Sequence, residues 1–225
     1  MEQEACVLLM AAGQSSRFGA EKIWQPLLGR PLLEWSLETL ESCPRVGSII
    51  LVVRAEHLQR ANSYLGSSRK VIAVAAGGKE RQDSVRAGLA VPFEEPLVLV
   101  HDGARPCLSL SLLERILDAL KEESAVVPAL PVSETLKHCS APGYILETLE
   151  RHDLWLAQTP QGFHRSVIDD AYSACKNQPR AQDDAYLVEQ SKGKVKVIEG
   201  DRANLKITEP VDLLLAEAIL KDRAR

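Results

Sequence analysis

Two cations near a glycine follow the first apolar segment of the chain. Residues 6–10 are apolar, and Gly13, Arg17 and Lys22 come after them. Backbone N–H groups at the carboxyl end of a parallel strand suit phosphate oxygens, and a guanidinium with an ammonium suits a triphosphate. A solvated surface loop with incidental charges is the alternative interpretation. The glycine spacing fits neither G-x-G-x-x-G nor the P-loop, which argues against a dinucleotide site.

Two more polar loops follow later apolar segments. The first, 77–84, comes before a predicted helix, with Asp83 or Ser84 as its expected N-cap. The second contains Asp102 and Arg105. A carboxylate at a strand end is a good Mg²⁺ anchor, because Mg²⁺ usually takes one or two carboxylates together with substrate phosphates. Arg105 is a possible structural salt-bridge partner of the same carboxylate.

Short apolar runs alternate with helical patterns between these loops. This alternation is typical of βαβ units, and it predicts an α/β fold: a Rossmann-like, mostly parallel sheet with helices on both faces. The expected strands are 6–10, 48–53, 71–75, 97–101, 125–129 and 195–199.

Helical spacing of apolar residues predicts three of the covering helices. One contains Leu33, Leu37 and Leu40, and a second starts at a Ser111-x-x-Glu114 capping box. The core face of the last helix is expected to consist of Val211, Leu214, Leu215 and Ala218.

The segment 131–161 departs from this pattern. Prolines and a glycine flank two short alternating pieces, 134–139 and 144–149, which predicts a β-hairpin. Because an isolated hairpin is marginally stable in water, it needs a surface to pack on. A dimer partner is favoured over its own domain. We therefore expect one domain, 1–225, with 131–161 as a dimerisation arm.

Composition excludes several classes of protein. The formal net charge is −4, whereas a general nucleic-acid binder carries a basic excess. The five cysteines show no C-x-x-C spacing, which is typical of reduced thiols in the cytoplasm. No apolar run approaches the roughly 18 residues of a membrane span, and no basic segment precedes the first apolar stretch. A cytoplasmic protein that uses neither membrane nor nucleic acid is expected.

Seven segments spread along the chain form a recognisable series. They read LLMAAGQSSRFG, GGKERQDSV, VHDGARPCL, PVSETLK, LWLAQTPQGF, QDDAYLVE and EGDRANLKIT. Each is weak alone, but their ordered combination is specific and spans nearly the whole chain. It resembles the 2-C-methyl-D-erythritol 4-phosphate cytidylyltransferase family of the non-mevalonate isoprenoid pathway.

For the nucleotide, the resemblance implies a site made of the first two loops. The backbone of Ala11, Ala12 and Gly13 and the loop from Gly78 to Ser84 hold cytosine and ribose. Arg17 and Lys22 bind the triphosphate and act catalytically. The loop between these two cations is shorter than is usual in the family.

For the acceptor, the resemblance implies residues from four later segments. Asp102 lies beside the metal, Mg²⁺, and the ribose or acceptor, and Arg105 belongs to the acceptor pocket. Thr135 and Lys206 line the same pocket, and Lys206 also touches the α-phosphate and acts catalytically. Arg151 and Thr159 reach across from the arm of the other subunit.

The implied reaction joins CTP and 2-C-methyl-D-erythritol 4-phosphate into 4-diphosphocytidyl-2-C-methyl-D-erythritol and pyrophosphate. The attacking phosphate monoester has a second pKa of about 6, so it is mostly dianionic at neutral pH and needs no general base. The alternatives are a ribitol 5-phosphate cytidylyltransferase and a catalytically silent CTP-binding regulatory protein, the latter suggested by the short loop.

Overall fold

The apolar segments of the sequence form the strands of one central sheet. The computed structural model describes residues 4–13, 18, 21–175 and 181–223. All six predicted strands are present, within two residues of the expected ends. They are β1 (Ala5–Ala11), β4 (Val46–Val53), β5 (Val71–Ala76), β6 (Leu97–Asp102), β7 (Ala125–Pro131) and β12 (Lys196–Glu199).

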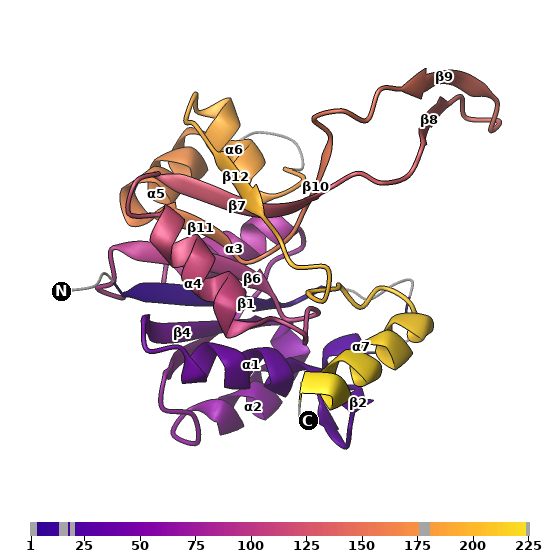
Figure 1. Cartoon of the computed structure of the whole chain (residues 1–225). Coiled ribbons are helices and arrows are strands. Elements are labelled where there is room, and N and C mark those ends of the chain that lie inside the picture. Colours follow the sequence, from indigo (N-terminus) through magenta and orange to yellow (C-terminus); the bar gives the residue numbers. More distant parts are fainter. Residues whose placement is uncertain (1–3, 14–17, 19–20, 176–180, 224–225) are drawn as a thin grey trace.

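The sheet is mixed but mostly parallel. It has 8 strands in the order β10-β7-β11-β6-β1-β4-β5, with β12 also pairing with β7. The pairs β1/β4, β1/β6, β4/β5 and β12/β7 are parallel. Two short strands, β10 (Trp155–Ala157) and β11 (Gln161–His164), run antiparallel to their neighbours. The predicted Rossmann-like α/β architecture is confirmed (Figure 1).

Helices cover both faces of this sheet, because successive side chains of a strand point to opposite sides. Val7 and Leu9 of β1 belong to the cluster formed with α1 (Leu32–Ser42) and α4 (Leu110–Ala119). Cys6 and Leu8 belong to a second cluster with α3 (Arg81–Leu89), α5 (Arg165–Ala174) and α6 (Asp184–Gln190). Burial on both faces keeps the strand ends, and hence the loops after them, in fixed positions.

Short elements connect the larger ones. A turn of 3₁₀ helix at Lys22–Trp24 leads into a small hairpin of β2 (Pro26–Leu27) and β3 (Arg30–Pro31). After β4 the chain forms α2 (Leu58–Ala61), between the 3₁₀ turns Ala55–His57 and Asn62–Tyr64. The turn at Lys22–Trp24 matters for the site, because it places Lys22 at the cavity beside the ends of the strands.

The last helix, α7 (Pro210–Arg223), buries a different face from the one predicted. Val211, Leu214 and Leu215 are 54%, 67% and 54% exposed, and Ala218 is also exposed. Ala216 and Leu220 are buried instead, packed with residues such as Leu27 and Leu32. The helix carries apolar residues around most of its circumference, so spacing alone offers two possible faces and the contact with β2 selects one.

Part of the predicted arm projects from the sheet. The strands β8 (Leu136–Cys139) and β9 (Ile145–Leu149) form the expected antiparallel hairpin, away from the rest of the molecule (Figure 1). Tyr144, Ile145 and Leu146 at its tip are 75%, 60% and 60% exposed. The end of the segment returns to the central sheet as β10 and the start of β11.

Two features predicted from composition can be compared with the structure. All five cysteines are free thiols, of which only Cys139 is exposed. Among the described residues, no helix combines the length and the apolarity that crossing a membrane requires.

The capping box predicted for α4 is wrong by two residues. The helix begins at Leu110, and its N-cap is Ser109, whose hydroxyl accepts a hydrogen bond from the Leu112 N–H at 3.3 Å. The same hydroxyl donates to Asp201 at 3.0 Å, and Glu114 pairs with Arg45 at 3.1 Å. Serine is a common N-cap residue at either position, and the contact with Asp201 favours the earlier one although only Ser111 has glutamate three residues later.

Ser109→Ala is predicted to lower the free energy of unfolding by about 1 kcal/mol, the usual loss for an N-cap hydroxyl. Ser111→Ala is the matched control and should change it by less than about 0.5 kcal/mol. Urea unfolding followed by circular dichroism measures both. Equal losses would contradict the assignment of Ser109 as the cap.

Candidate active site

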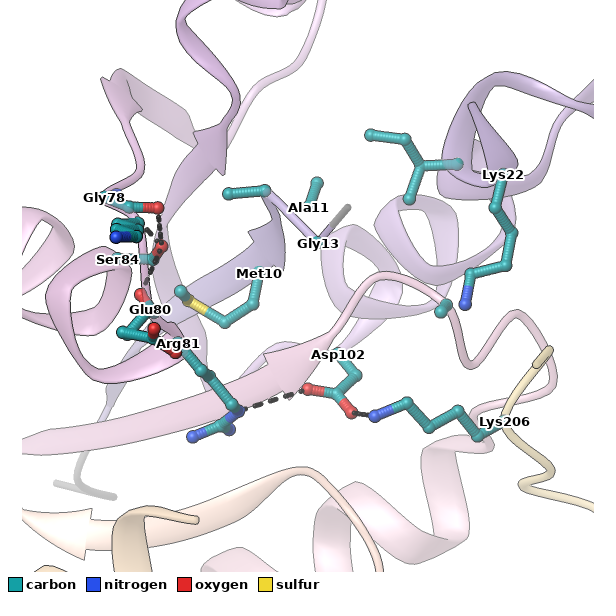
Figure 2. A pocket seen from close by; sticks show the side chains of 14 residues that line it. Met10, Ala11, Gly13, Lys22, Gly78, Glu80, Arg81, Ser84, Asp102 and Lys206 are labelled. Carbon is teal, nitrogen blue, oxygen red and sulfur yellow. Dashed lines mark hydrogen bonds and ion pairs between the residues drawn. The ribbon is translucent and has the colours of Figure 1, made fainter. Parts of the chain in front are cut away.

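The loops after β1, β5 and β6 meet at one edge of the sheet and enclose a cavity of about 260 Å³. Ligands bind at this edge in open α/β sheets, because the carboxyl ends of the strands converge there. Figure 2 shows the cavity with residues from these loops and from the segment before α7. Its lining residues are Met10, Ala11, Ala12, Gly13, Lys22, Ile23, Gly78, Lys79, Glu80, Arg81, Ser84, Asp102, Ala104 and Lys206.

The loop between β5 and α3 forms one wall of the cavity. Ser84 is buried, and its hydroxyl accepts from the Gly78 N–H at 3.1 Å and donates to the Glu80 carbonyl at 3.2 Å. A Cβ on Gly77 would lie 2.4 Å from the Ala12 Cβ, so glycine is needed for this loop to approach the one after β1. Two backbone segments thereby face the cavity side by side.

The N-cap of α3 is Glu80, not Asp83 or Ser84 as predicted. Glu80 and Asp83 form a reciprocal capping box, in which the Glu80 N–H donates to the Asp83 carboxylate at 3.2 Å. Ser84 is therefore inside the first turn of the helix, where its hydroxyl is available to fix the loop.

Asp102 lines the cavity between two cations, Arg81 and Lys206. Its Oδ2 lies 2.6 Å from the Lys206 Nζ and its Oδ1 3.7 Å from the Arg81 Nε, and the residue is 9% exposed. Burial alone would raise the pKa of Asp102. The positive charges of Lys206, Arg81 and Arg105 outweigh this effect and hold the pKa well below its usual range. Asp102 is therefore a carboxylate at neutral pH.

Thr159 and His101 support Asp102 from behind. The Thr159 Oγ1 accepts from the Asp102 N–H at 3.0 Å and is 3.1 Å from the His101 Nδ1. Both residues are buried, and burial lowers the pKa of His101 to about 3. The imidazole is thus neutral, and it contributes position rather than charge.

Lys206 is held opposite Asp102 by a network of buried groups. Arg105 Nη1 donates to the Asn204 carbonyl at 2.7 Å, and the Asn204 Nδ2 donates to the Thr159 carbonyl at 2.8 Å. The next bond along, from the Ile207 N–H to the Ala104 carbonyl, is 2.8 Å long. The segment before α7 therefore cannot move independently of the loop after β6.

Lys22 lines the same cavity from the turn after the first loop. Its Nζ donates to the Ile207 carbonyl at 2.5 Å. Lys22 thus contacts the segment that contains Lys206, and these two lysines from distant parts of the chain line the same cavity (Figure 2). Together with Asp102 they form a site suited to an anionic ligand and a divalent cation.

Comparison with known proteins agrees with this geometry. The model of the 2-C-methyl-D-erythritol 4-phosphate cytidylyltransferase family matches residues 5–222. The chain belongs to this family.

Relatives of that name resemble the chain over its full length. The proteins from Dehalococcoides mccartyi (strain ATCC BAA-2266) and Geobacillus kaustophilus are each 40% identical, over 98% and 99% of both chains. Among solved structures, the synthase of 4-diphosphocytidyl-2C-methyl-D-erythritol from Anaerococcus prevotii has a TM-score of 0.85 at 30% identity, covering 98% of this chain and 97% of that one. The Thermus thermophilus cytidylyltransferase has a TM-score of 0.77 at 34% identity, covering 98% and 100%.

Most residues that the family resemblance points to lie around the cavity. The structure brings together Ala11, Ala12, Gly13, Lys22, Gly78, Ser84, Asp102 and Lys206. Arg17 lies outside the described residues. Thr135 and Arg151 are exposed on the arm and do not line the cavity of their own chain.

Two of the expected substrate residues, Thr159 and Arg105, do not line the cavity. Thr159 is 5% exposed and bonded to Asp102 of its own chain, so it does not extend from the arm to another subunit. Arg105 is 8% exposed, and its Nη1 donates to the Asn204 carbonyl, two residues before Lys206. In the structure described, these two residues contact the groups that position Asp102 and Lys206.

Two charged residues in the site were not singled out from the sequence. Arg81 lies between Asp102 and the fully buried Asp184, with its Nη1 2.7 Å from the Asp184 Oδ2. Arg81 belongs to the GGKERQDSV segment and Asp184 to QDDAYLVE, which are about 100 residues apart. The segments could be recognised, but the ion pair between them joins the start of α3 to the start of α6, a contact that no local pattern predicts.

A pH dependence follows from the burial of His101. The unfolded state takes up a proton near pH 6.5, whereas the folded state does so only near pH 3. Between these values the unfolded state binds more protons, so the free energy of unfolding falls as the pH is lowered, by up to about 1.4 kcal/mol per pH unit.

His101→Asn is predicted to make this fall shallower between pH 6.5 and 5. His152→Gln, at an exposed position, is the control and should keep the wild-type slope. Chemical unfolding at several pH values measures the effect. A His101→Asn slope equal to that of the wild type would show that the imidazole is protonated in the folded protein.

Proposed function

We propose that the protein transfers a cytidylyl group from CTP to 2-C-methyl-D-erythritol 4-phosphate and releases pyrophosphate. The observation that carries the proposal is the combination, in one cavity, of a wall of backbone groups with a cluster of Asp102, Lys22 and Lys206. This combination fits a nucleotide whose phosphates lie against the charged residues, in a chain of this family.

Cytosine and ribose bind along the wall formed by Ala11, Ala12, Gly13, Gly78 and Ser84. Among the described residues that line the cavity, none has an aromatic ring. Base recognition therefore depends on backbone hydrogen bonds rather than on stacking. The buried Ser84 hydroxyl, which fixes the Gly78 N–H, holds that wall in shape.

The triphosphate binds to Lys22 and Lys206, with Arg17 as the third cation of the proposal. Lys206 has 43% of its side chain exposed, so it can turn from Asp102 toward the α-phosphate. Placing positive charge where negative charge develops on the five-coordinate phosphorus is the main catalytic effect. The acceptor phosphate is itself the nucleophile, and no general base is required.

Asp102 is the residue that would hold the divalent cation, proposed to be Mg²⁺. No group of three or more metal-ligating side chains exists among the described residues. One carboxylate fits Mg²⁺ nevertheless, since this ion takes most of its ligands from substrate phosphates and water. When bound, the cation neutralises phosphate charge, and Asp102 fixes where it does so.

The acceptor is bound with the help of a second subunit. Arg151, a cation, and Thr135, a polar residue, lie on an arm that projects away from the central sheet. They therefore serve the cavity of a partner subunit. The exposed Tyr144, Ile145 and Leu146 give the arm an apolar surface suited to burial in a dimer. Residues 1–225 then act as one nucleotidyltransferase domain with 131–161 as its dimerisation arm.

The protein is proposed to work in the cytoplasm on small molecules, without nucleic acid or membrane. The mildly acidic composition and the five free cysteines support this assignment.

An assay of pyrophosphate release tests the function. With CTP and Mg²⁺, 2-C-methyl-D-erythritol 4-phosphate is expected to support turnover and ribitol 5-phosphate is not. Lys206→Ala should lower the rate about 10²–10³-fold, as expected for the loss of one charge-stabilising donor. If only ribitol 5-phosphate supports turnover, that compound is the acceptor and the proposal is wrong. CTP binding without pyrophosphate release would indicate a catalytically silent CTP-binding protein.

Arg151→Ala is predicted to raise the KM for the acceptor while leaving the KM for CTP near the wild-type value. Mixing Arg151→Ala chains with Lys22→Ala chains should restore activity, because one site of each mixed dimer combines an intact cavity with an intact arm. Lys137→Ala, another exposed cation of the arm, is the control. If mixing gives no more activity than the sum of the two variants, Arg151 serves its own subunit.

A further inference from the structure

Asp102 is part of a row of four side chains with alternating charge. Asp184 Oδ2 lies 2.7 Å from the Arg81 Nη1, Arg81 Nε lies 3.7 Å from the Asp102 Oδ1, and Asp102 Oδ2 lies 2.6 Å from the Lys206 Nζ. Figure 2 shows Asp102 between Arg81 and Lys206. One carboxylate oxygen thus faces each cation.

Asp184, at the buried end of this row, is held in place by hydrogen bonds. Asp184 is 0% exposed, and its Oδ1 accepts from the Tyr172 hydroxyl at 2.6 Å. Its backbone N–H donates to Gln161 Oε1 at 3.2 Å, and Gln161 is also buried. Burial alone would lower the pKa of Arg81, but Asp184 and then Asp102 raise it above its ordinary value. Arg81 is therefore a permanent cation held from behind.

Lys206, at the exposed end of the row, can change partners. The side chain of Lys206 is 43% exposed, compared with 29% for Arg81 and 0% for Asp184. Lys206 also lines the cavity in which the proposed triphosphate binds. The two cations next to Asp102 differ accordingly: one is anchored and one can leave.

We propose that Arg81 is a positioning residue of the reaction: anchored by Asp184, it holds Asp102 in place when Lys206 leaves to contact phosphate. The inference rests on the proposed function and assigns a role to a residue outside the triphosphate and acceptor contacts.

The physical reason is the burial of Asp102. A carboxylate that is 9% exposed is strongly destabilised if its last partner is removed. Contact between Arg81 and Oδ1 keeps the charge paired and leaves Oδ2, now bonded to Lys206, as the atom that would hold the proposed divalent cation. Only a planar, forked guanidinium can reach both Asp102 and Asp184 with separate nitrogens.

Three variants remove this anchor in different ways. Arg81→Lys keeps the charge but loses the fork, Asp184→Asn removes the anchoring charge, and Tyr172→Phe removes one bond to Asp184. The first two are expected to lower kcat about 10–100-fold, as a misplaced reacting group does, with the KM for CTP within about 3-fold of wild type. Tyr172→Phe should also lower kcat, but by less. It tests the proposal if Arg81→Lys or Asp184→Asn does not fold.

Arg86→Lys is the matched control. Arg86 is on the same helix, has the same 29% side-chain exposure, and contacts Asp83 and the Cys175 carbonyl rather than Asp102. Its replacement should leave kcat within about 2-fold of wild type. An equal loss in Arg86→Lys and Arg81→Lys would mean that any guanidinium of α3 is needed only for folding, which overturns the proposal.

A double-mutant cycle separates positioning from a merely structural role. If Arg81 acts through Asp102, Arg81→Lys should change kcat by less than about 2-fold in an Asp102→Asn background. Losses that multiply in the double variant would show that Arg81 acts independently of Asp102, and the proposal would be wrong.

A binding measurement distinguishes this proposal from the function on which it rests. Calorimetric titration of Mg²⁺ into protein with saturating CTP and no acceptor should give a Kd at least about 5-fold weaker in Arg81→Lys and Asp184→Asn, and unchanged in Arg86→Lys. Wild-type affinity in both variants overturns the role of Arg81. Failure of the wild type to release pyrophosphate would instead reject the proposed reaction, while the titration would still test the anchor.

Discussion

A buried carboxylate that has to stay ionised, Asp102, is the constraint on which the site depends. At 9% exposure it has lost most of its contact with solvent, so cations of the protein are needed to stabilise its charge. Arg81 comes from the start of α3 and Lys206 from the segment before α7, on opposite sides of the strand end. The sheet order, with β1 between β4 and β6, makes these approaches possible by placing the loops after β1, β5 and β6 around one cavity.

Much of the fold could be predicted because it depends on patterns within single segments. The central strands β1, β4 and β6 are buried on both faces and are continuous apolar runs, and all six expected strands are present. Errors arose where a segment was compatible with two arrangements. Ser109 and Ser111 both suit an N-cap, and only the contact with Asp201 favours the first. The helix α7 has two apolar faces, and only the packing against β2 shows which is buried.

The part of the site that lies at the ends of strands could be predicted from the sequence. Gly13, Gly78 and Asp102 follow predicted strands, and parallel strands bring such positions together. The pairing of Arg81 with Asp184 was not predictable in this way, because the two residues belong to helices whose contact no local pattern encodes. The same limit explains Thr159: the family resemblance implied that it reaches another subunit from the arm, but the chain returns to the sheet at β10 and Thr159 is buried beside Asp102.

A net charge of −4 excludes a broad basic surface, yet it does not describe this site. A cavity lined only with cations would repel itself in the free protein and would bind any small anion. Two of the cations here have a carboxylate neighbour: Arg81 has Asp184, and Lys206 has Asp102. These carboxylates offset part of the positive charge that the lysines and Arg81 bring to the free cavity. If Lys206 leaves Asp102 for phosphate, as proposed, a divalent cation in its place would keep the carboxylate paired, and the positive charge available to a polyanion would be greatest when cation and nucleotide are bound together.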